Sequence, residues 1–543
     1  MHWPTKLALA LSALVLSGAA ATAQSSGIQV RDLGAVDPFQ VGVGGGLSDA
    51  AWNASEAEGL RALFERLPDG SGEGWTQPLA ARLAERALMS SGAPPRGARD
   101  DFELAALRAD RALAAGRAGP VYALLNRTPR INESATLSRL LVETAFASGD
   151  REAACRAADA LLDGRDSPYW LRARAACLAY SGAIPAAELT AELARSSGVD
   201  APVFDALLDA YVLDGELPAN AVPTNGLELA LAASAAPAAS ITVAEDAPVW
   251  LRRAASRTGP QISLPPDPVG ALEAIEALSG PEREAALGAL IQQDADRAIA
   301  AEALAQRLSS ATEAGRFVEV ARAYGEEVST LPITAATLSS GEAFAFAALL
   351  AGDTNAARRW RRALEQGPPP APRTSAADIG GLISQEGAGQ LRPMPSRPVV
   401  EPQAPFESAS PEVLVRLDFA IAIAENGLRR SDFGALLAAR AETEDAQRLR
   451  EIAALTALGQ SPPAQVTARM MSEPLISGAN PVGGLLAARA RARGEAMLHA
   501  AAILEADSVT MSGAYLATRI LAEAGLESEA RRVIVEMISE HRS

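Results

Sequence analysis

The chain has 543 residues, which is more than one hydrophobic core accommodates, so the length indicates several domains or one elongated array. Hydrophobic residues make up 48% of the chain, which excludes a wholly disordered protein. The net charge of −17 argues against a nucleic-acid partner, because such proteins carry a basic surface. Only 4% of residues are aromatic, and a core of Ala, Leu and Val predicts an all-α fold.

The N-terminus has the pattern of a secretory signal peptide. One positive charge at Lys6 precedes the apolar run Leu7–Leu16, and small residues follow, ending in Ala21-Thr22-Ala23. This order predicts a signal peptide over residues 1–23, cleaved after Ala23. The run is too short to span a bilayer comfortably, and no later segment is long and apolar enough. We therefore expect a periplasmic or secreted protein without a membrane span after cleavage.

Glycine-rich sequence follows the predicted cleavage point. Residues 24–54 show no helical period, so we expect a flexible leader. The run Gly42–Gly46 follows no predicted strand and opens no helix, so it does not indicate a phosphate-binding loop, and no cofactor is expected. Helical patterning begins near Ser55 and Pro78, and a first block of helical repeats is predicted over residues 55–257.

Residues of this first block show the pattern of a two-helix hairpin. One helix has an apolar stripe made of Leu137, Leu140, Leu141, Thr144 and Ala145. Ser134 is placed to cap that helix, Gly149 suits the left-handed position at its end, and Asp150 can cap the next helix. Ser167 and Pro168 have the sequence of a further helix start.

The turn glycine recurs at intervals close to 33 residues, with one interval near two periods and one break. The repeat turn glycines are Gly116, Gly149, Gly182, Gly215, Gly280, Gly315, Gly352, Gly427, Gly459, Gly494 and Gly525. A small or β-branched residue usually lies five positions later, namely Val121, Ala154, Ala187, Ala285, Val320, Ala357, Ala464 and Ala530. This self-similarity predicts an array of helix–turn–helix repeats.

A period of this length, with a turn glycine and a small residue five positions on, resembles the tetratricopeptide (TPR) repeat. The resemblance covers roughly residues 100–360 and 412–540. It would place Gly149 at the turn between the two helices and Ala154 at the small position of the second helix. The chain lacks the family's large aromatic residues and most of its closing prolines, so it is similar to a degenerate member.

The resemblance implies an α-solenoid, in which stacked modules cover one another's apolar stripes and leave a concave face. Such a face binds a protein or an extended peptide. The stretch Asp166–Gly182 also resembles uncharacterised exported helical-repeat proteins of alphaproteobacteria, which brings no known activity with it.

Proline-rich segments divide the array. A joint over residues 257–269 separates the first block from a middle block over 270–366. Residues 367–411 contain too much proline and glycine for a regular core, so they form either a linker, which the composition favours, or a long loop across the groove. A C-terminal block is predicted over 412–543.

The two cysteines, Cys155 and Cys177, each lie eleven residues from Asp166, at the turn between their helices. In an antiparallel hairpin, equal distances from the turn bring two residues to the same level. An oxidising compartment permits a disulfide between them, and two small buried core residues are the alternative. The pair alone does not supply the ligand set of a zinc site, so no metal is predicted.

Candidates for catalysis are few. His2 falls in the signal peptide, His499 is expected to be a partly exposed helix residue, and neither it nor His541 lies near a nucleophile motif. The pair Asp100-Asp101 fits a helix cap or a solvated face better than acid–base chemistry. No catalytic residue is therefore predicted.

The arginine-rich run Arg358–Leu364 could bind an anionic partner, but a helix face whose arginines extend around Trp360 is the simpler interpretation.

These observations predict a non-catalytic helical-repeat scaffold that mediates protein–protein interaction in the bacterial periplasm or cell envelope. The expected partner is a protein or an extended peptide, with cell-envelope components suggested by the compartment. The alternative is a peptidoglycan-acting enzyme of the lytic-transglycosylase kind, in which a helical superhelix carries a catalytic domain. No segment departs from the repeat pattern to supply such a domain.

Overall fold

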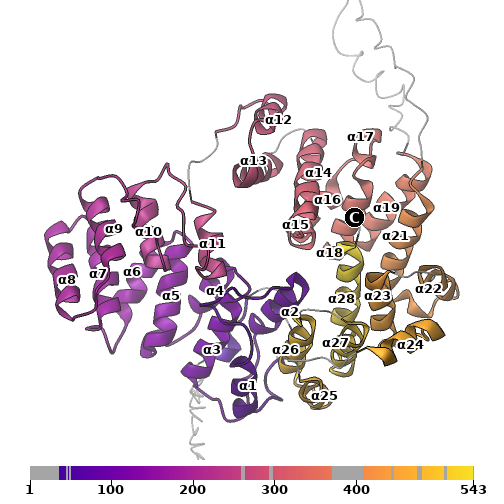
Figure 1. Ribbon diagram of the computed structural model, residues 1–543, viewed down its shortest axis with the longest axis horizontal. Helices are drawn as coiled ribbons and strands as arrows, with labels where there is room; N and C mark the ends of the chain where they lie inside the picture. The colour runs from indigo at the N-terminus through magenta and orange to yellow at the C-terminus, as the bar shows by residue number, and fades with distance from the viewer. Residues whose placement is uncertain are drawn as a thin grey trace, which may run out of the picture. The chain divides into compact units, whose positions relative to one another are not determined.

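A computed structural model describes residues 36–43, 47, 50–258, 263–292, 297–369, 408–441, 445–473, 480–506 and 510–541. The predicted signal peptide, most of the predicted leader and most of the predicted linker lie outside the described residues. Within the described ranges the fold is all-α, without a strand, as the composition predicted (Figure 1). Among these residues, no helix is long and apolar enough to cross a membrane.

Among the N-terminal helices, the first two α-helices begin close to Ser55 and at Pro78, as predicted, and a short 3-10 helix precedes them within the predicted leader. In order they are η1 (Pro38–Gln40), α1 (Ala57–Phe64), α2 (Pro78–Leu88), α3 (Phe102–Leu113), α4 (Ala118–Leu125), η2 (Ile131–Glu133), α5 (Ala135–Ala147), α6 (Arg151–Ala160), α7 (Pro168–Tyr180), α8 (Ile184–Ser196), α9 (Pro202–Val212), α10 (Gly226–Ala235) and α11 (Val249–Ala255). The starts of α3, α5, α7 and α9 are about 33 residues apart. Later helices do not keep that spacing, so the period stays a prediction.

The remaining helices vary more in length. Those before the predicted linker are α12 (Pro268–Glu276), α13 (Gly280–Gln292), α14 (Arg297–Glu313), α15 (Phe317–Ala323), α16 (Gly325–Thr330), α17 (Ala335–Leu338), α18 (Gly341–Ala351) and α19 (Thr354–Gln366). Those after it are α21 (Pro411–Ala424), η3 (Gly427–Arg429), α22 (Phe433–Ala441), α23 (Ala446–Thr456), α24 (Ala464–Ser472), α25 (Pro481–Arg489), α26 (Arg493–Leu504), α27 (Met511–Glu523) and α28 (Glu527–Glu540).

The α5–α6 hairpin is set by local chemistry. The Ser134 hydroxyl accepts a hydrogen bond from the Leu137 amide at 3.3 Å, and the Asp150 carboxylate accepts one from the Ala153 amide at 2.9 Å. Between these caps Gly149 has φ of +82°, and the Asp150 amide closes the end of α5 on the Ala145 carbonyl at 3.0 Å. Ser167 stands at the N-cap of α7, but its hydroxyl makes no capping bond.

Most of the repeat glycines adopt the left-handed conformation. These are Gly116, Gly149, Gly182, Gly280, Gly315, Gly352, Gly459 and Gly525. At Gly215 and Gly427 the preceding residue, Asp214 or Asn426, has the positive φ instead. Gly494 lies inside α26, where a Cβ would come within 2.6 Å of the Trp52 ring, so close packing rather than a turn explains it.

The residues five positions beyond the glycines mostly face the core. Val121, Ala154, Ala187, Val320, Ala357 and Ala530 are buried, whereas Ala285 and Ala464 are exposed. Small side chains at these positions let neighbouring helices approach closely.

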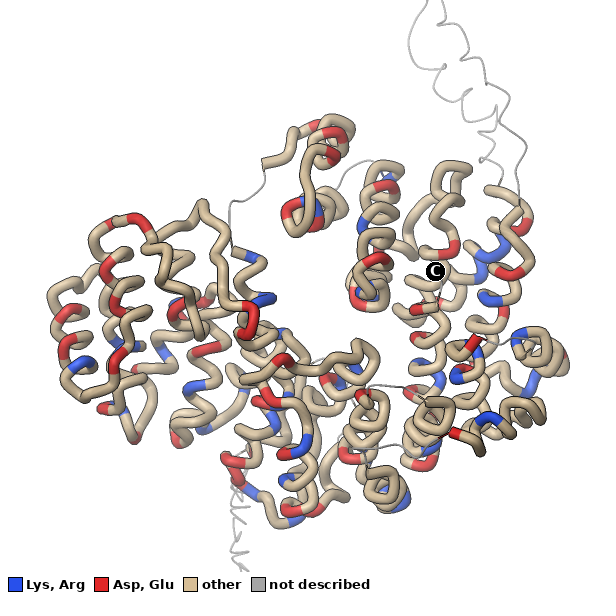
Figure 2. Tube along the Cα trace, viewed as in Figure 1, with Lys and Arg blue, Asp and Glu red and all other residues tan. Residues whose placement is uncertain are grey.

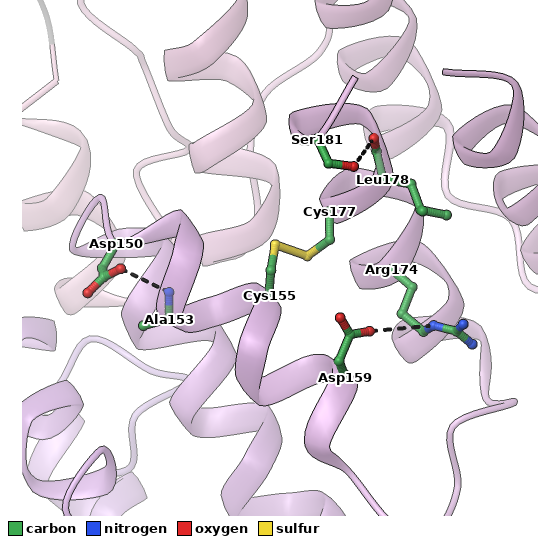
Figure 3. Close-up of a disulfide and its surroundings, with 8 residues drawn as sticks. All are labelled: Asp150, Ala153, Cys155, Asp159, Arg174, Cys177, Leu178 and Ser181. Carbon is green, nitrogen blue, oxygen red and sulfur yellow. Dashed lines mark hydrogen bonds and ion pairs between the residues drawn. A yellow bond between two sulfur atoms is a disulfide. The ribbon is translucent and has the colours of Figure 1, made fainter. Parts of the chain in front are cut away.

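A disulfide joins Cys155 on α6 to Cys177 on α7, with a Cα–Cα distance of 5.5 Å (Figure 3). The two helices therefore lie antiparallel with these residues at one level. Asp159 and Arg174 approach each other at 4.0 Å further along the same pair of helices. The bond attaches the α7–α8 hairpin to the helices before it.

Helix contacts are not confined to neighbours in the sequence. α10 packs against α5, although four helices separate them in the chain. α2 packs against α26, α23 against α27, and α28 contacts α2, α15, α18, α21 and α23. Helices close to the two ends of the described chain, α2 and α28, thus share contacts within a unit that spans Asp37–Ser543. The predicted division into three blocks stays a prediction.

Candidate functional site

A cavity of about 530 Å³ is lined by residues of α2, α4, α11 and α15 and of the segments next to them. Its charged wall residues are Arg82, Arg86, Arg117, Arg253 and Arg322, with Glu85 and Glu319. We name it the arginine cavity. Acidic residues outnumber basic ones in the chain and are spread over its helices (Figure 2), so this local excess of arginine points to a binding site.

The helix α2 is built to present two of these arginines. Leu79, Leu83 and Ala87 are buried on the apolar side of the helix, which packs against α26. Arg82 and Arg86 lie four residues apart and line the cavity. The amphipathic pattern of α2 therefore fixes both guanidinium groups on the cavity wall.

Glu536 of α28 forms ion pairs with two arginines of the cavity wall. Arg82 Nε donates to Glu536 Oε2 at 2.8 Å, and Arg322 of α15 forms a second ion pair with the same carboxylate. Arg82 also donates to Glu540 at 2.7 Å. Burial opposes ionisation of Glu536, but Arg82 and Arg322 outweigh it and hold the pKa of this carboxyl below its usual value. The cluster joins three helices that are distant in sequence.

The charge of Arg86 is less fully compensated by carboxylates than that of Arg82. It pairs with Glu529 of α28. Burial lowers the pKa of Arg86 to about 10, against the charge of Glu529, and the nearby charges of Arg532 and Arg322 act in the same direction as burial. An added negative charge in the cavity would therefore be stabilising for Arg86.

Two further arginines have only weak partners. Arg117 is half-exposed and reaches Glu85 at 3.3 Å, which is long for an ion pair. Arg253 Nη1 donates to the Ala115 carbonyl at 3.2 Å and has no ion pair with any described carboxylate. Its guanidinium lies against Gly116, where a Cβ would come within 3.0 Å of Cζ. Both guanidinium groups can therefore bind a ligand without breaking the ion pairs of Arg82 and Arg322 with Glu536.

The arrangement suits anion binding. Guanidinium groups recognise carboxylates and phosphates through paired, charge-assisted hydrogen bonds. The residues that line the cavity include neither histidine nor cysteine. Among the described residues, no group of three His, Cys, Asp or Glu side chains is placed to hold a metal ion.

The histidines lie away from the cavity. The expectation that His499 is partly exposed is wrong: it is buried in α26, next to Gly483 and Gly484, and burial lowers its pKa to about 4. His541 pairs with Asp445 at 2.5 Å.

The other polar groups singled out in the sequence have structural partners. Asp101 caps α3, its carboxylate accepting from the Leu104 amide at 2.9 Å. Asp100 pairs with Arg130 at 3.0 Å.

In the run Arg358–Leu364 of α19, Trp360 is buried. Arg361 pairs with Glu365 and with Asp418, and Arg358 pairs with Glu425. These arginines serve the contact between α19 and α21.

Glu143 is a buried carboxylate whose surroundings resemble those of a catalytic acid. Burial raises its pKa, against the hydrogen bond from the Gly226 amide. That amide donates to Glu143 Oε2 at 2.5 Å at the start of α10. Glu143 therefore caps α10 from α5, and it is not among the residues that line the arginine cavity.

Comparisons of the chain with protein-family models, with curated proteins and with solved structures found no match. The arginine cavity was not predicted from the sequence, because its residues come from four helices spread over some 240 positions. One local signal did exist: Arg82 and Arg86 stand four apart on the polar side of a strongly amphipathic helix.

Proposed function

We propose that the chain is an exported, non-catalytic helical scaffold that mediates protein–protein interaction in the bacterial periplasm or cell envelope. The single observation that supports it is the arginine cavity, in which five arginines face two glutamates in a chain of net charge −17. Such a wall complements an acidic segment of a partner protein.

The partner segment would bind chiefly through Arg117 and Arg253. These two guanidinium groups have no strong protein partner to give up, whereas Arg82 and Arg322 are committed to Glu536. Arg82 and Arg322 contribute positive potential from the wall, and Arg117 and Arg253 supply the direct hydrogen bonds.

Site-specific photo-crosslinking in cells tests this function. A photoreactive amino acid at Glu319, on the cavity wall, should form a discrete adduct whose crosslinked peptide is rich in Asp and Glu. The same amino acid at Glu192, exposed on α8, serves as the position control. Adducts of equal yield at both positions, or a crosslinked peptide without acidic residues, would refute the proposal.

Charge-matched variants sharpen the test. Arg117→Gln with Arg253→Gln should abolish the adduct at position 319. Arg165→Gln with Arg429→Gln removes the same charge at two exposed residues that do not line the cavity, and should leave the adduct intact. Loss of the adduct in both double variants would mean that net charge, not the cavity, determines binding.

Two measurements address export and the absence of catalysis. N-terminal sequencing of protein from the periplasmic fraction should begin at Gln24. Purified mature protein incubated with peptidoglycan should release no soluble muropeptides. Robust release would favour the enzyme alternative over the scaffold.

A further inference from the structure

A second, smaller cavity of about 230 Å³ lies among α5, α6, α10 and α11, helices that neighbour one another in Figure 1. Its polar wall consists of two arginines and three hydroxyl residues: Arg151, Arg257, Ser148, Ser234 and Thr258. None of the residues that line it is a carboxylate. We name it the Arg257 cavity.

Arg151 is held in place without a counter-charge. Its guanidinium lies over the Tyr180 ring, with Cζ 5.2 Å from the ring centroid, and Nη1 donates to the Ser234 hydroxyl at 3.1 Å. Tyr180 is in turn packed in edge contact with Tyr211 at 5.2 Å. These contacts orient the arginine, but they supply no negative charge, and no described carboxylate forms an ion pair with it.

Arg257 has still fewer partners. Its side chain makes no hydrogen bond or ion pair with any residue that the structure describes. Burial lowers the pKa of Arg257, and the positive charge of Arg117 lowers it further. Arg257 is exposed, so its guanidinium can exchange water for an anion without breaking any contact within the protein.

The hydroxyl groups complete the lining. Ser234 Oγ already accepts from Arg151 and donates to the Ala230 carbonyl. Thr258 Oγ1 donates to the Ala255 carbonyl and accepts from the Ile241 amide at 3.1 Å. The donors left over on the wall are therefore the guanidinium N–H groups and the hydroxyl of Ser148, which favour an oxygen ligand of negative charge.

We propose that the Arg257 cavity binds one small oxyanion, a carboxylate or phosphate group, between the guanidinium groups of Arg151 and Arg257. The volume is below that of sites for drug-sized ligands, so the cavity takes a free small anion or the charged terminal group of a larger ligand. The inference goes beyond the proposed scaffold function and does not depend on the arginine cavity.

Isothermal titration calorimetry on the mature full-length protein tests the proposal, with inorganic phosphate and acetate as probes and sodium chloride balancing ionic strength. Phosphate or acetate, or both, should bind saturably, and the stronger probe identifies the ligand class. One site per chain should remain in the Arg117→Gln, Arg253→Gln double variant, which removes the free guanidinium groups of the arginine cavity. Arg257→Gln should weaken binding at least about tenfold, since hydrogen bonds to charged groups are worth that much. The affinity of Arg257→Lys should lie between those of the unchanged chain and Arg257→Gln, because lysine keeps the charge but lacks the planar guanidinium group.

Arg429→Gln is the matched control, since it removes the same charge at an exposed residue of η3 that does not line this cavity. It should bind the probes as the unchanged chain does. A far-ultraviolet circular dichroism spectrum checks that each variant is folded. If Arg257→Gln does not fold, phenylglyoxal labelling of the unchanged chain takes its place, and phosphate or acetate should protect Arg257 while leaving Arg429 reactive.

The proposal is overturned if neither probe binds saturably to the unchanged chain. It is also overturned if Arg257→Gln and Arg429→Gln bind the probes equally well. In the labelling experiment, the proposal is overturned if phosphate and acetate protect Arg257 no better than chloride does, and no better than they protect Arg429.

Discussion

Replacing Glu536 by Gln should loosen the contact between α28, α2 and α15. The carboxylate is buried and serves two guanidinium groups, of Arg82 and Arg322, whose side chains are 14% and 24% exposed. Removing one partner of a buried ion pair costs roughly 3–5 kcal/mol, because the remaining charge stays buried without compensation. Arg82 keeps its bond to Glu540, so we expect the lower end, about 3 kcal/mol.

Hydrogen exchange measured by mass spectrometry is the suitable assay, because it reports opening of individual helices in a large protein. A loss of about 3 kcal/mol corresponds to roughly a hundredfold faster exchange of amides protected by that contact. The increase should be confined to peptides that cover α2, α15 and α28. Peptides of α7 and α8 should exchange as before.

Glu523→Gln is the control for this experiment. Glu523 lies on α27 and pairs with Arg519 one helical turn away, on the surface of the helix. Exposed pairs of this kind contribute less than about 1 kcal/mol. If Glu536→Gln exchanges no faster than Glu523→Gln in α2 and α28, the reasoning about the buried cluster is wrong.

Three further outcomes are expected. Burial lowers the pKa of His499 to about 4, so the folded protein keeps this imidazole neutral. The free energy of unfolding should therefore fall by up to about 3 kcal/mol as the pH drops from about 6.5 towards 4. His499→Gln should flatten this part of a profile of melting temperature against pH. Gly226→Ala should lower the free energy of unfolding by about 3 kcal/mol, since its Cβ would lie 2.1 Å from a backbone oxygen of α5. The control is Gly59→Ala in α1, whose Cβ meets open space and which should stabilise the protein slightly. Urea unfolding measures both. Reducing the Cys155–Cys177 bond, which closes a loop over 22 positions, should cost about 3 kcal/mol and speed hydrogen exchange in α6 and α7; unchanged exchange there would contradict this.

Local features of the fold were predictable from the sequence because their information lies within a few residues. Ser134 and Asp150 cap the helices that follow them, and Gly149 closes α5, as their residue types indicated. Helical patterning placed the starts of α1 and α2 within about two residues. Each of these structures depends on contacts no further than one turn of helix.

Long-range contacts could not be predicted in the same way. Arg82 and Glu536 are separated by 454 positions, and nothing near either residue identifies the other. The burial of His499 depends on Gly483 and Gly484, which let the neighbouring helix α25 approach the imidazole ring closely. Helical periodicity shows which face of a helix is apolar, but not which distant helix covers that face.

The buried cluster around Glu536 has a consequence for how the chain acquires its structure. During synthesis, α2 leaves the ribosome more than 400 residues before the carboxylate that neutralises its Arg82. Until then the apolar side of α2 also lacks α26, so this region is exposed to proteases and to association with other nascent chains. Such distant pairing makes the final closure slow, and a chain cut short before α28 would keep an open, unsatisfied N-terminal region.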